Sequence, residues 1–473
     1  MTENYWSKPE SETEFDPFNS LISELSDPEI AEEEFREDFF KGLAGRRQKA
    51  AFILMSIWGI TILLHLTSWG KWLVLTATLL TGIQILRYLF AVPQPTPSAL
   101  TTSENAIVPK ISLLIAAKNE EAVISNSIAM LCSLDYPSDK YEVWAIDDRS
   151  TDNTPAILDR LALEYPQLKV VHRTANASGG KSGALNQVIP QTSGDIIGVF
   201  DADAKVSTNL LKQVVPLFDE SNLGAVQVRK AIANSTDNFW TKGQAAEMAL
   251  DSYVQQQRIA VGGIGELRGN GQFVSRTALY SCGGWNEETI TDDLDLTIRL
   301  HLDNWKIGFL LTPPVLEEGV TKASSLWHQR NRWAEGGYQR YLDYWRYIVR
   351  SPMGLGKKID LICWMVLQYM IPAANVPDGI MAIARHRLPL FSPITALLFT
   401  WGFIGMFKGL LRTQTRLGKA IDLPLLLNIT GRSIGGLVYM IHWQIVMLSV
   451  TARMSIRPKR LKWVKTVHEG TDK

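Results

Sequence analysis

The sequence predicts an α/β domain with a mainly parallel sheet, inserted between apolar segments long enough to cross a membrane. From residue 110 to about residue 340, short β-branched apolar runs alternate with segments of helical spacing, which is typical of parallel sheets flanked by helices. Apolar runs of ~20 residues, the length of a membrane-spanning helix, precede and follow this region. Polar clusters follow directly after several apolar runs, where sheets of this kind bind ligands.

The charges of the chain are unevenly distributed. Its 473 residues have a formal net charge of +0, but residues 1–45 are acidic, so the remainder is net basic. A basic surface suits a protein that works beside anionic lipid. We expect the acidic segment to be a disordered cytosolic tail, with a regulatory or partner-binding role as the alternative. We expect no nucleic-acid partner.

Two membrane-spanning helices are predicted in residues 46–93. The apolar runs 50–69 and 72–92 are separated by a turn that is too short for anything but a hairpin. Basic residues precede the first run, so the positive-inside rule places the N-terminus in the cytosol, and the second crossing returns the chain there. Residues 94–109 are predicted to be a linker.

The C-terminal third predicts an interfacial helix followed by further membrane-spanning helices. Aromatic and basic residues are interleaved in residues 341–358, as in amphipathic helices at a membrane interface. Residues 359–452 contain three long apolar runs, of which the last is 423–450. The loop 408–419 and the tail 453–473 are both basic, so both should be cytosolic. Either the last run is therefore re-entrant or doubled, or the tail departs from the rule.

The first polar cluster of the α/β region follows its second predicted strand. Asp147 and Asp148 come directly after this strand. Carboxylates in this position can accept hydrogen bonds from a uracil ring or a ribose hydroxyl, so we expect both to contact a nucleotide. Ser150, Thr151 and Asp152 are also good helix N-caps, and capping is the alternative role of this cluster.

Two further clusters suggest a phosphate site and a metal site. Gly179 and Gly180 precede Lys181 at the start of a predicted helix, an arrangement that can bind phosphate oxygens, with a plain turn as the alternative. A later apolar strand leads directly into Asp201 and Asp203. Their two carboxylates suit a hard divalent cation, Mg²⁺ or Mn²⁺, which takes its other ligands from a diphosphate.

A helix is predicted to begin at Thr291, Asp292 and Asp293. Thr291 is expected to cap this helix, and carboxylates at a helix start commonly interact with the helix dipole. The catalytic alternative is general-base chemistry, because an inverting sugar transfer needs one base to take the proton of the attacking hydroxyl. We expect Asp293, or Asp292, to be that base.

The last cluster contains Gln329, Arg330, Arg332 and Trp333. An arginine can pair with a diphosphate, and a tryptophan offers a flat face to a sugar or an acceptor. We expect this cluster to bind the substrates, with a basic and aromatic membrane-interface segment as the alternative.

The order of these motifs resembles the processive-type branch of glycosyltransferase family two, which includes cellulose, hyaluronan and lipid glucosyl synthases. The resemblance covers residues 111–341 and the flanking apolar helices, and it implies a GT-A fold, a UDP-sugar donor and inversion of the anomeric centre. Cellulose synthases carry glutamate where this chain has Asp292, which puts the orienting role of that residue in doubt. The resemblance places Asp147 and Asp148 at the nucleotide, Lys181 near the diphosphate, Asp201 and Asp203 at the nucleotide and metal, Asp293 as the base, and Gln329, Arg332 and Trp333 over the donor and acceptor.

The acceptor is predicted from features outside this domain. The acidic tail, the paired N-terminal spans and the ending 463–468 resemble the cyanobacterial monoglucosyldiacylglycerol synthases. This resemblance implies transfer of glucose from UDP-glucose to diacylglycerol, with formation of a β-glucoside at the cytosolic face of a plasma or thylakoid membrane. The alternatives are a processive β-polysaccharide synthase, a ceramide or sterol glucosyltransferase, and a catalytically dead membrane protein that binds UDP-sugars. The sequence makes no prediction of the oligomeric state.

Overall fold

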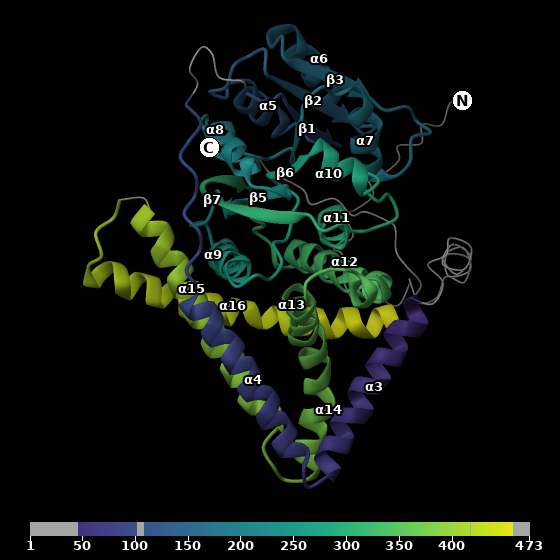
Figure 1. Cartoon of the computed structure of the whole chain (residues 1–473), viewed down its shortest axis with the longest axis vertical. Coiled ribbons are helices and arrows are strands. Elements are labelled where there is room, and N and C mark those ends of the chain that lie inside the picture. Colours follow the sequence, from purple (N-terminus) through teal and green to yellow (C-terminus); the bar gives the residue numbers. More distant parts are fainter. Residues whose placement is uncertain (1–45, 102–107, 417, 457–473) are drawn as a thin grey trace, which may run out of the picture.

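The computed structural model describes residues 46–101, 108–416 and 418–456. The predicted acidic tail lies outside these residues, as does the basic tail beyond residue 456. An α/β domain stands on a group of long helices that converge away from it (Figure 1). The two parts are therefore separate layers, as the alternation of polar and apolar regions in the sequence predicts.

The α/β domain is built around a seven-stranded sheet with the strand order β3-β2-β1-β4-β6-β5-β7. The strand β1 pairs in parallel with β2 and β4, and β2 pairs in parallel with β3. The strand β6 is antiparallel to β4 and β5, whereas β7 is parallel to β5. The strands are β1 (Ile111–Ala117), β2 (Tyr141–Asp147), β3 (Leu168–His172), β4 (Ile196–Phe200), β5 (Leu223–Ile232), β6 (Gln272–Ser275) and β7 (Lys306–Glu317).

Helices cover both faces of this sheet, and alternate residues of β1 show why. Leu113 and Ile115 belong to the apolar core on one face, and Leu114 belongs to the core on the other. A strand that is buried on both faces must be apolar throughout, which explains the continuous apolar run in the sequence. The helices of the domain are α5 (Ile124–Cys132), α6 (Thr154–Glu164), α7 (Gly180–Val188), η1 (Ile189–Gln191), α8 (Leu210–Val214), η2 (Val215–Asp219), α9 (Phe239–Ala260), α10 (Arg276–Ser281), α11 (Asp292–Leu302) and α12 (Ala323–Arg350).

Within the described residues, five helices are long and apolar enough to cross a membrane. Most of their apolar surface is not buried inside the protein, as for Phe52 and Leu79, whose side chains are exposed. An exposed apolar surface of this extent fits a membrane protein, in which lipid covers such helices. These helices are α3 (Arg46–Leu66), α4 (Gly70–Phe90), the continuous helix formed by α13 (Leu355–Met365), η3 (Val366–Met370) and α14 (Ile371–Ala384), then α15 (Ser392–Arg416) and α16 (Leu423–Ile456).

The helix α16 is oriented differently from the other four. It lies across the ends of α3, α4 and α13 that are nearest to the α/β domain (Figure 1), and it contacts α9 and α12 of that domain. Tyr439 and Trp443 donate hydrogen bonds to the carboxylate of Glu247 in α9, at 2.9 and 2.8 Å. The helix runs without a break from Leu423 to Ile456, so the last apolar run of the sequence is not doubled.

The predicted boundary at residue 340 falls inside a single helix. The helix α12 runs from Ala323 to Arg350. The Gln-x-x-Arg-Trp motif, Gln329 to Trp333, and much of the predicted interfacial segment therefore belong to the same element. Arg46, at the start of α3, donates two hydrogen bonds to the Asp343 carboxylate, at 2.6 and 2.5 Å. This ion pair ties the first apolar helix to the α/β domain.

Candidate active site

One cavity of about 1390 Å³ connects the sheet with the apolar helices. Its polar part is lined by residues that follow β1, β2 and β4, whose carboxyl ends share one edge of the sheet because the strands are parallel. Its apolar part is lined by α4, α13, η3, α14, α15 and α16. Of the predicted site residues, the cavity brings together Asp148, Lys181, Asp201, Asp203, Asp292, Asp293, Gln329, Arg332 and Trp333.

Asp147 and Asp148 have different environments. Asp148 lines the cavity and forms an ion pair with Arg173, with 2.7 Å between Oδ1 and Nη1. Asp147 is buried, accepts a hydrogen bond from the Ser150 backbone N–H at 3.1 Å, and does not line the cavity. The side-chain hydroxyl of Ser150 accepts a hydrogen bond from the backbone N–H of Asn119. The cluster therefore ties two loops together, and Asp148 is the carboxylate of the pair that lines the cavity.

Lys181 and the Asp-x-Asp pair meet at the centre of the polar part. Gly179 has φ +80, a left-handed backbone that glycine adopts readily, and it precedes the helix that carries Lys181. The Lys181 Nζ atom lies 2.6 Å from Asp201 Oδ1. Burial works to lower the pKa of Lys181, but the carboxylates of Asp201 and Asp292 more than offset burial, and the pKa is raised. Lys181 therefore stays protonated and carries a positive charge beside the end of β4.

Asp203 is more enclosed than Asp201. It is buried, and its Oδ2 accepts a hydrogen bond from the Glu318 backbone N–H at 2.8 Å. The side chain of Asp201 remains 41% exposed. This difference leaves Asp201 open to a ligand, while Asp203 also holds the segment that follows β7.

Asp293 has the environment expected of a general base. Its Oδ1 accepts a hydrogen bond from the Leu294 backbone N–H at 2.8 Å. Burial, and then the neighbouring charge of Asp292, raise the pKa of Asp293 to about 6. A carboxylate with a pKa near the working pH is well suited to take and release a proton. Gly269 adjoins it, since a Cβ atom at that position would lie only 3.4 Å from Asp293 Oδ2.

The expected cap by Thr291 is wrong in its side-chain detail. Thr291 occupies the N-cap position of α11, but its hydroxyl makes no capping hydrogen bond. The reason is tight packing, because the Cβ of a residue placed at Gly336 would lie 2.1 Å from Thr291 Oγ1. The hydroxyl of Thr291 thus contacts α12, and Gly336 allows α12 to approach the start of α11 closely.

The Gln-x-x-Arg-Trp motif divides between two faces of α12. Gln329, Arg332 and Trp333 line the cavity, whereas Arg330 does not. Arg330 is completely buried and forms an ion pair with Glu247 of α9, at 2.6 Å. Its guanidinium also lies 4.1 Å from the centre of the Trp333 ring. Arg330 therefore packs against the ring of Trp333 and does not line the cavity.

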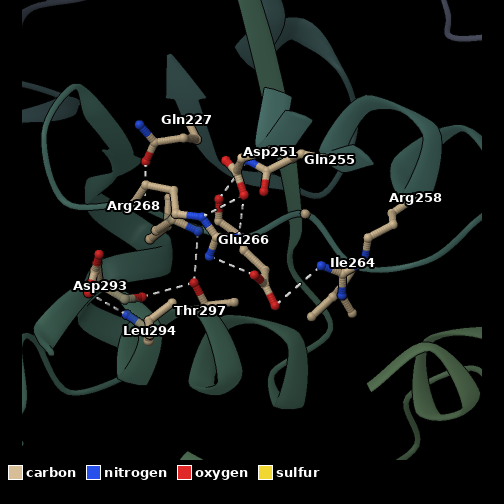
Figure 2. Close-up of polar contacts among 12 residues, drawn as sticks. Gln227, Asp251, Gln255, Arg258, Ile264, Glu266, Arg268, Asp293, Leu294 and Thr297 are labelled. Carbon is tan, nitrogen blue, oxygen red and sulfur yellow. Dashed lines mark hydrogen bonds and ion pairs between the residues drawn. The ribbon is translucent and has the colours of Figure 1, made fainter. Parts of the chain in front are cut away.

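Several residues of the cavity were not predicted from the sequence. Lys230 forms an ion pair with Glu317 at 2.8 Å and lies over the ring of Trp333. Figure 2 shows Arg268 between Asp251 and Glu266, with N···O distances of 2.9 and 2.6 Å. The arginine precedes Gly269, and a charged residue in the glycine-rich stretch 268–271 is the only sequence signal that could have suggested it.

The comparisons with known proteins agree with this geometry. A β-monoglucosyldiacylglycerol synthase of Synechocystis sp. is 58% identical over 462 residues, which cover 97% of this chain and 96% of that protein. Its counterpart from Nostoc sp. is 56% identical over the full length of both chains. A family model described as glycosyltransferase like family 2 matches residues 109–336.

This chain belongs to the family of the β-monoglucosyldiacylglycerol synthases. It is a glycosyltransferase, and its predicted fold class is confirmed. A solved mannosyltransferase of Pyrobaculum calidifontis, in complex with GDP-Man and Mn²⁺, is similar in fold, with a TM-score of 0.52 and 21% identity over 85% of this chain and 99% of that one. A poly-β-1,6-N-acetyl-D-glucosamine synthase of Staphylococcus epidermidis is 28% identical over 62% of this chain.

Asp201 and Asp203 are the candidate ligands for a divalent cation, which would take further ligands from the substrate. In the described part of the chain, no group of three or more His, Cys, Asp or Glu side chains is placed to bind a metal by itself. Asp201 and Asp203 supply carboxylate oxygens, and the buried Oδ2 of Asp292 hydrogen-bonds to no other described residue. A hard cation that takes few protein ligands and completes its shell with diphosphate oxygens fits this donor set.

Proposed function

We propose that this protein transfers glucose from UDP-glucose to the free hydroxyl of 1,2-diacylglycerol, with inversion at the anomeric carbon. The observation that carries the proposal is the single cavity that begins at the Asp-x-Asp pair and ends among apolar helices. In such a cavity the polar donor can occupy the polar part and the apolar acceptor the apolar part, and the two can meet where these parts join. The name borne by the full-length relatives supports the same reaction.

Several polar residues of the cavity are assigned to binding the donor. Asp148 hydrogen-bonds the nucleotide, and Lys181 and Arg332 neutralise the diphosphate, with Trp333 closing over the sugar. Burial lowers the pKa of Arg332, against the raising effect of Asp201, yet an arginine remains charged at any working pH. We assign Mg²⁺ or Mn²⁺ to Asp201 and Asp203, where it would stabilise the negative charge of the departing UDP.

Asp293 takes the proton in the chemical step. The acceptor oxygen forms a bond to C1 of glucose while the bond from C1 to the diphosphate oxygen breaks. The hydroxyl proton moves to the Asp293 carboxylate, and UDP leaves with the bonding electron pair. Because one displacement occurs at C1, an α-linked donor gives a β-glucoside. Asp292 raises the pKa of Asp293 through its charge and thereby strengthens the base.

The acceptor reaches this site from the bilayer along one face of α4. Val74, Ala77, Thr81, Gln84 and Tyr88 line the cavity on this helix. Residues 74 to 88 extend over about 21 Å at ~1.5 Å per residue, which exceeds one leaflet of a hydrocarbon core that is ~30 Å thick. A lipid in the leaflet beside the α/β domain can therefore place its acyl chains against α4 while its hydroxyl approaches Asp293.

The orientation of α16 suggests a topology that satisfies the positive-inside rule. Four helical segments cross the membrane, namely α3, α4, α13 to α14, and α15. The helix α16 lies along the cytosolic surface, with an exposed apolar stripe that includes Leu427, Ile434, Val438 and Ile445 toward the lipid. The basic loop before α16 and the basic tail after it then share the cytosolic side with the α/β domain, at a plasma or thylakoid membrane.

Product analysis tests the proposed function. The purified full-length protein is incubated in detergent with radiolabelled UDP-glucose, Mg²⁺ and diacylglycerol, and the products are separated by thin-layer chromatography. We expect a single labelled glucolipid, and UDP-galactose in a parallel reaction tests the choice of donor. Labelled polymer retained at the origin would instead support a processive polysaccharide synthase and refute the proposal.

A further inference from the structure

Between the catalytic carboxylates and the apolar helices, the cavity passes a buried cluster of charged residues. Arg258, Glu266, Arg268 and Arg340 all line the cavity here. Glu266 joins the cluster, because its two carboxylate oxygens lie 2.6 Å from Arg268 and 3.1 Å from Arg340. The three arginines are balanced by the carboxylates of Glu266, Asp251 and Asp360.

Arg340 differs from Arg258 in how many of its donors are used. Arg258 directs Nε and Nη2 to the Asp360 carboxylate and Nη1 to Glu266. Arg340 donates only from Nη2, to Glu266 and to the Tyr341 hydroxyl. Its Nε and Nη1 atoms are buried and have no hydrogen-bond partner among the described residues. The side chain is only 4% exposed, so a guanidinium with free N–H donors is held in a nearly closed site.

The position of Arg340 places these free donors close to the reaction centre. Gly337 lies one helical turn before Arg340 and also lines the cavity. A Cβ atom at Gly337 would lie 3.7 Å from the side chain of Leu294, the residue directly after Asp293. On the other side, Arg340 pairs with Glu266, and Glu266 pairs with Arg268, whose charge lowers the pKa of Asp293. Figure 2 shows Glu266, Arg268 and Asp293 in the same part of the site.

We infer that Arg340 binds the ester carbonyl oxygens of the lipid acceptor and thereby positions its free hydroxyl at Asp293. An ester offers hydrogen-bond acceptors and no donors, which complements the free N–H groups of Arg340. Because carboxylates already balance the charges of the three arginines, the cluster favours a neutral ligand over a negatively charged phosphate. Buried donors without a partner disfavour a ligand that lacks the matching oxygens. Arg340 is thus a positioning residue that distinguishes an ester-linked diglyceride from other alcohols, and the inference rests on the proposed function.

Two acceptors with identical chains test this inference. One is a 1,2-diacylglycerol, and the other is the corresponding 1,2-dialkylglycerol, which keeps the hydroxyl but lacks both carbonyl groups. For the wild-type protein we expect kcat/KM to be about tenfold higher for the diacyl acceptor, because hydrogen bonds to a charged donor are lost with the ether. Arg340→Lys keeps the positive charge beside Glu266 but removes the guanidinium donors, and the ratio should fall close to one.

Arg330→Lys is the matched control. Arg330 is on the same helix, is equally buried and is ion-paired, but it does not line the cavity, so this variant should keep the wild-type ratio. A wild-type ratio near one, or a high ratio that persists in Arg340→Lys, would overturn the inference. If Arg340→Lys does not fold, a wild-type ratio near one still overturns the inference. Failure of the wild-type protein to glucosylate either diglyceride would overturn the proposed function itself.

Discussion

At the scale of single residues, the proposed chemistry depends on the raised pKa of one carboxylate, that of Asp293. Asp293 is surrounded by Asp292, which raises its pKa, and by Lys230 and Arg268, which lower it. Burial is the largest effect, and the pKa of Asp293 settles at about 6. Asp201 instead lies against Lys181. Two carboxylates in one cavity thus have different environments, which suits the separate roles proposed for them.

Asp293→Asn should abolish glucose transfer while leaving UDP binding intact. The amide has almost the same shape but cannot take a proton, and a general base commonly contributes at least ~100-fold to the rate. Initial rates with diacylglycerol measure the loss, and calorimetric titration with UDP checks that the donor site is preserved. Activity of the variant close to that of the wild type would show that another residue is the base.

The rate should depend on pH through the same residue. Asp293 acts when it is ionised, and its pKa is raised to about 6, so kcat/KM should fall as the pH drops through about 6. The variant Asp292→Asn removes one cause of the raised pKa and should shift this midpoint to lower pH. The pH profile of kcat/KM reports ionisations in the free enzyme, and an unchanged midpoint in Asp292→Asn would contradict the assignment.

At the scale of elements, close contacts between helices fix the walls of the cavity between the α/β domain and the apolar helices. Gly336 lets α12 approach the start of α11, and Gly436 lets α16 approach α9 and α15. A Cβ atom at Gly436 would lie 2.7 Å from Ala246 Cβ and 2.8 Å from Met406 Sδ. Such contacts fix how the membrane helices are placed beneath the catalytic residues, because α9, α12 and α16 all line the cavity.

Two adjacent glycines of α16 allow a matched test of this packing. Gly436→Ala should destabilise the protein by about 1–3 kcal/mol through overpacking. Gly435 has no neighbour within 4 Å of an added Cβ atom, so Gly435→Ala should be neutral or stabilising by up to ~1 kcal/mol through helix propensity. Thermal unfolding in detergent compares the two, and equal stabilities would mean that α16 is not packed against α9 as described.

The sequence predicted the parts of the site that follow strands of the parallel sheet, because a strand and its polar end are adjacent in the chain. Asp148 and Asp201 were found in this way, whereas Asp293 was found at the start of a predicted helix. Arg340 and Glu266 were not, because they are 74 residues apart and neither lies in a local pattern. The strands β6 and β7 were also missed, and the direction of α16 could not be predicted, since apolar length does not specify whether a helix crosses a bilayer or lies along it.

At the scale of the whole molecule, the α/β domain and the apolar helices share one cavity and one set of buried ion pairs. Asp360, at the start of the third apolar segment, is bound to Arg258 of α9 and accepts a hydrogen bond from Tyr88 of α4. The catalytic domain is therefore fixed to the membrane helices and cannot turn freely above them. A fixed position suits an enzyme whose acceptor remains in the bilayer.

Labelling of introduced cysteines in sealed cells tests the proposed topology. Ser68 lies in the turn between α3 and α4, and Lys419 lies in the loop before α16, and both are exposed. An impermeant thiol reagent added from outside should modify Ser68→Cys but not Lys419→Cys. Modification of both from the same side would mean that at least one of α4, the segment α13 to α14, and α15 does not cross the membrane.

The most direct test of acceptor entry from the bilayer places a bulky side chain in the cavity and measures the preference of the enzyme for acyl-chain length. Ala77 and Leu79 of α4 are both exposed, but only Ala77 lines the cavity. The measured quantity is the ratio of kcat/KM for a long-chain diacylglycerol to that for a short-chain one. Ala77→Trp should lower this ratio about tenfold or more, because a bulky side chain occupies the space of the acyl chain, and Leu79→Trp should keep the wild-type ratio. A wild-type ratio in Ala77→Trp would contradict the claim that the lipid reaches Asp293 through this cavity.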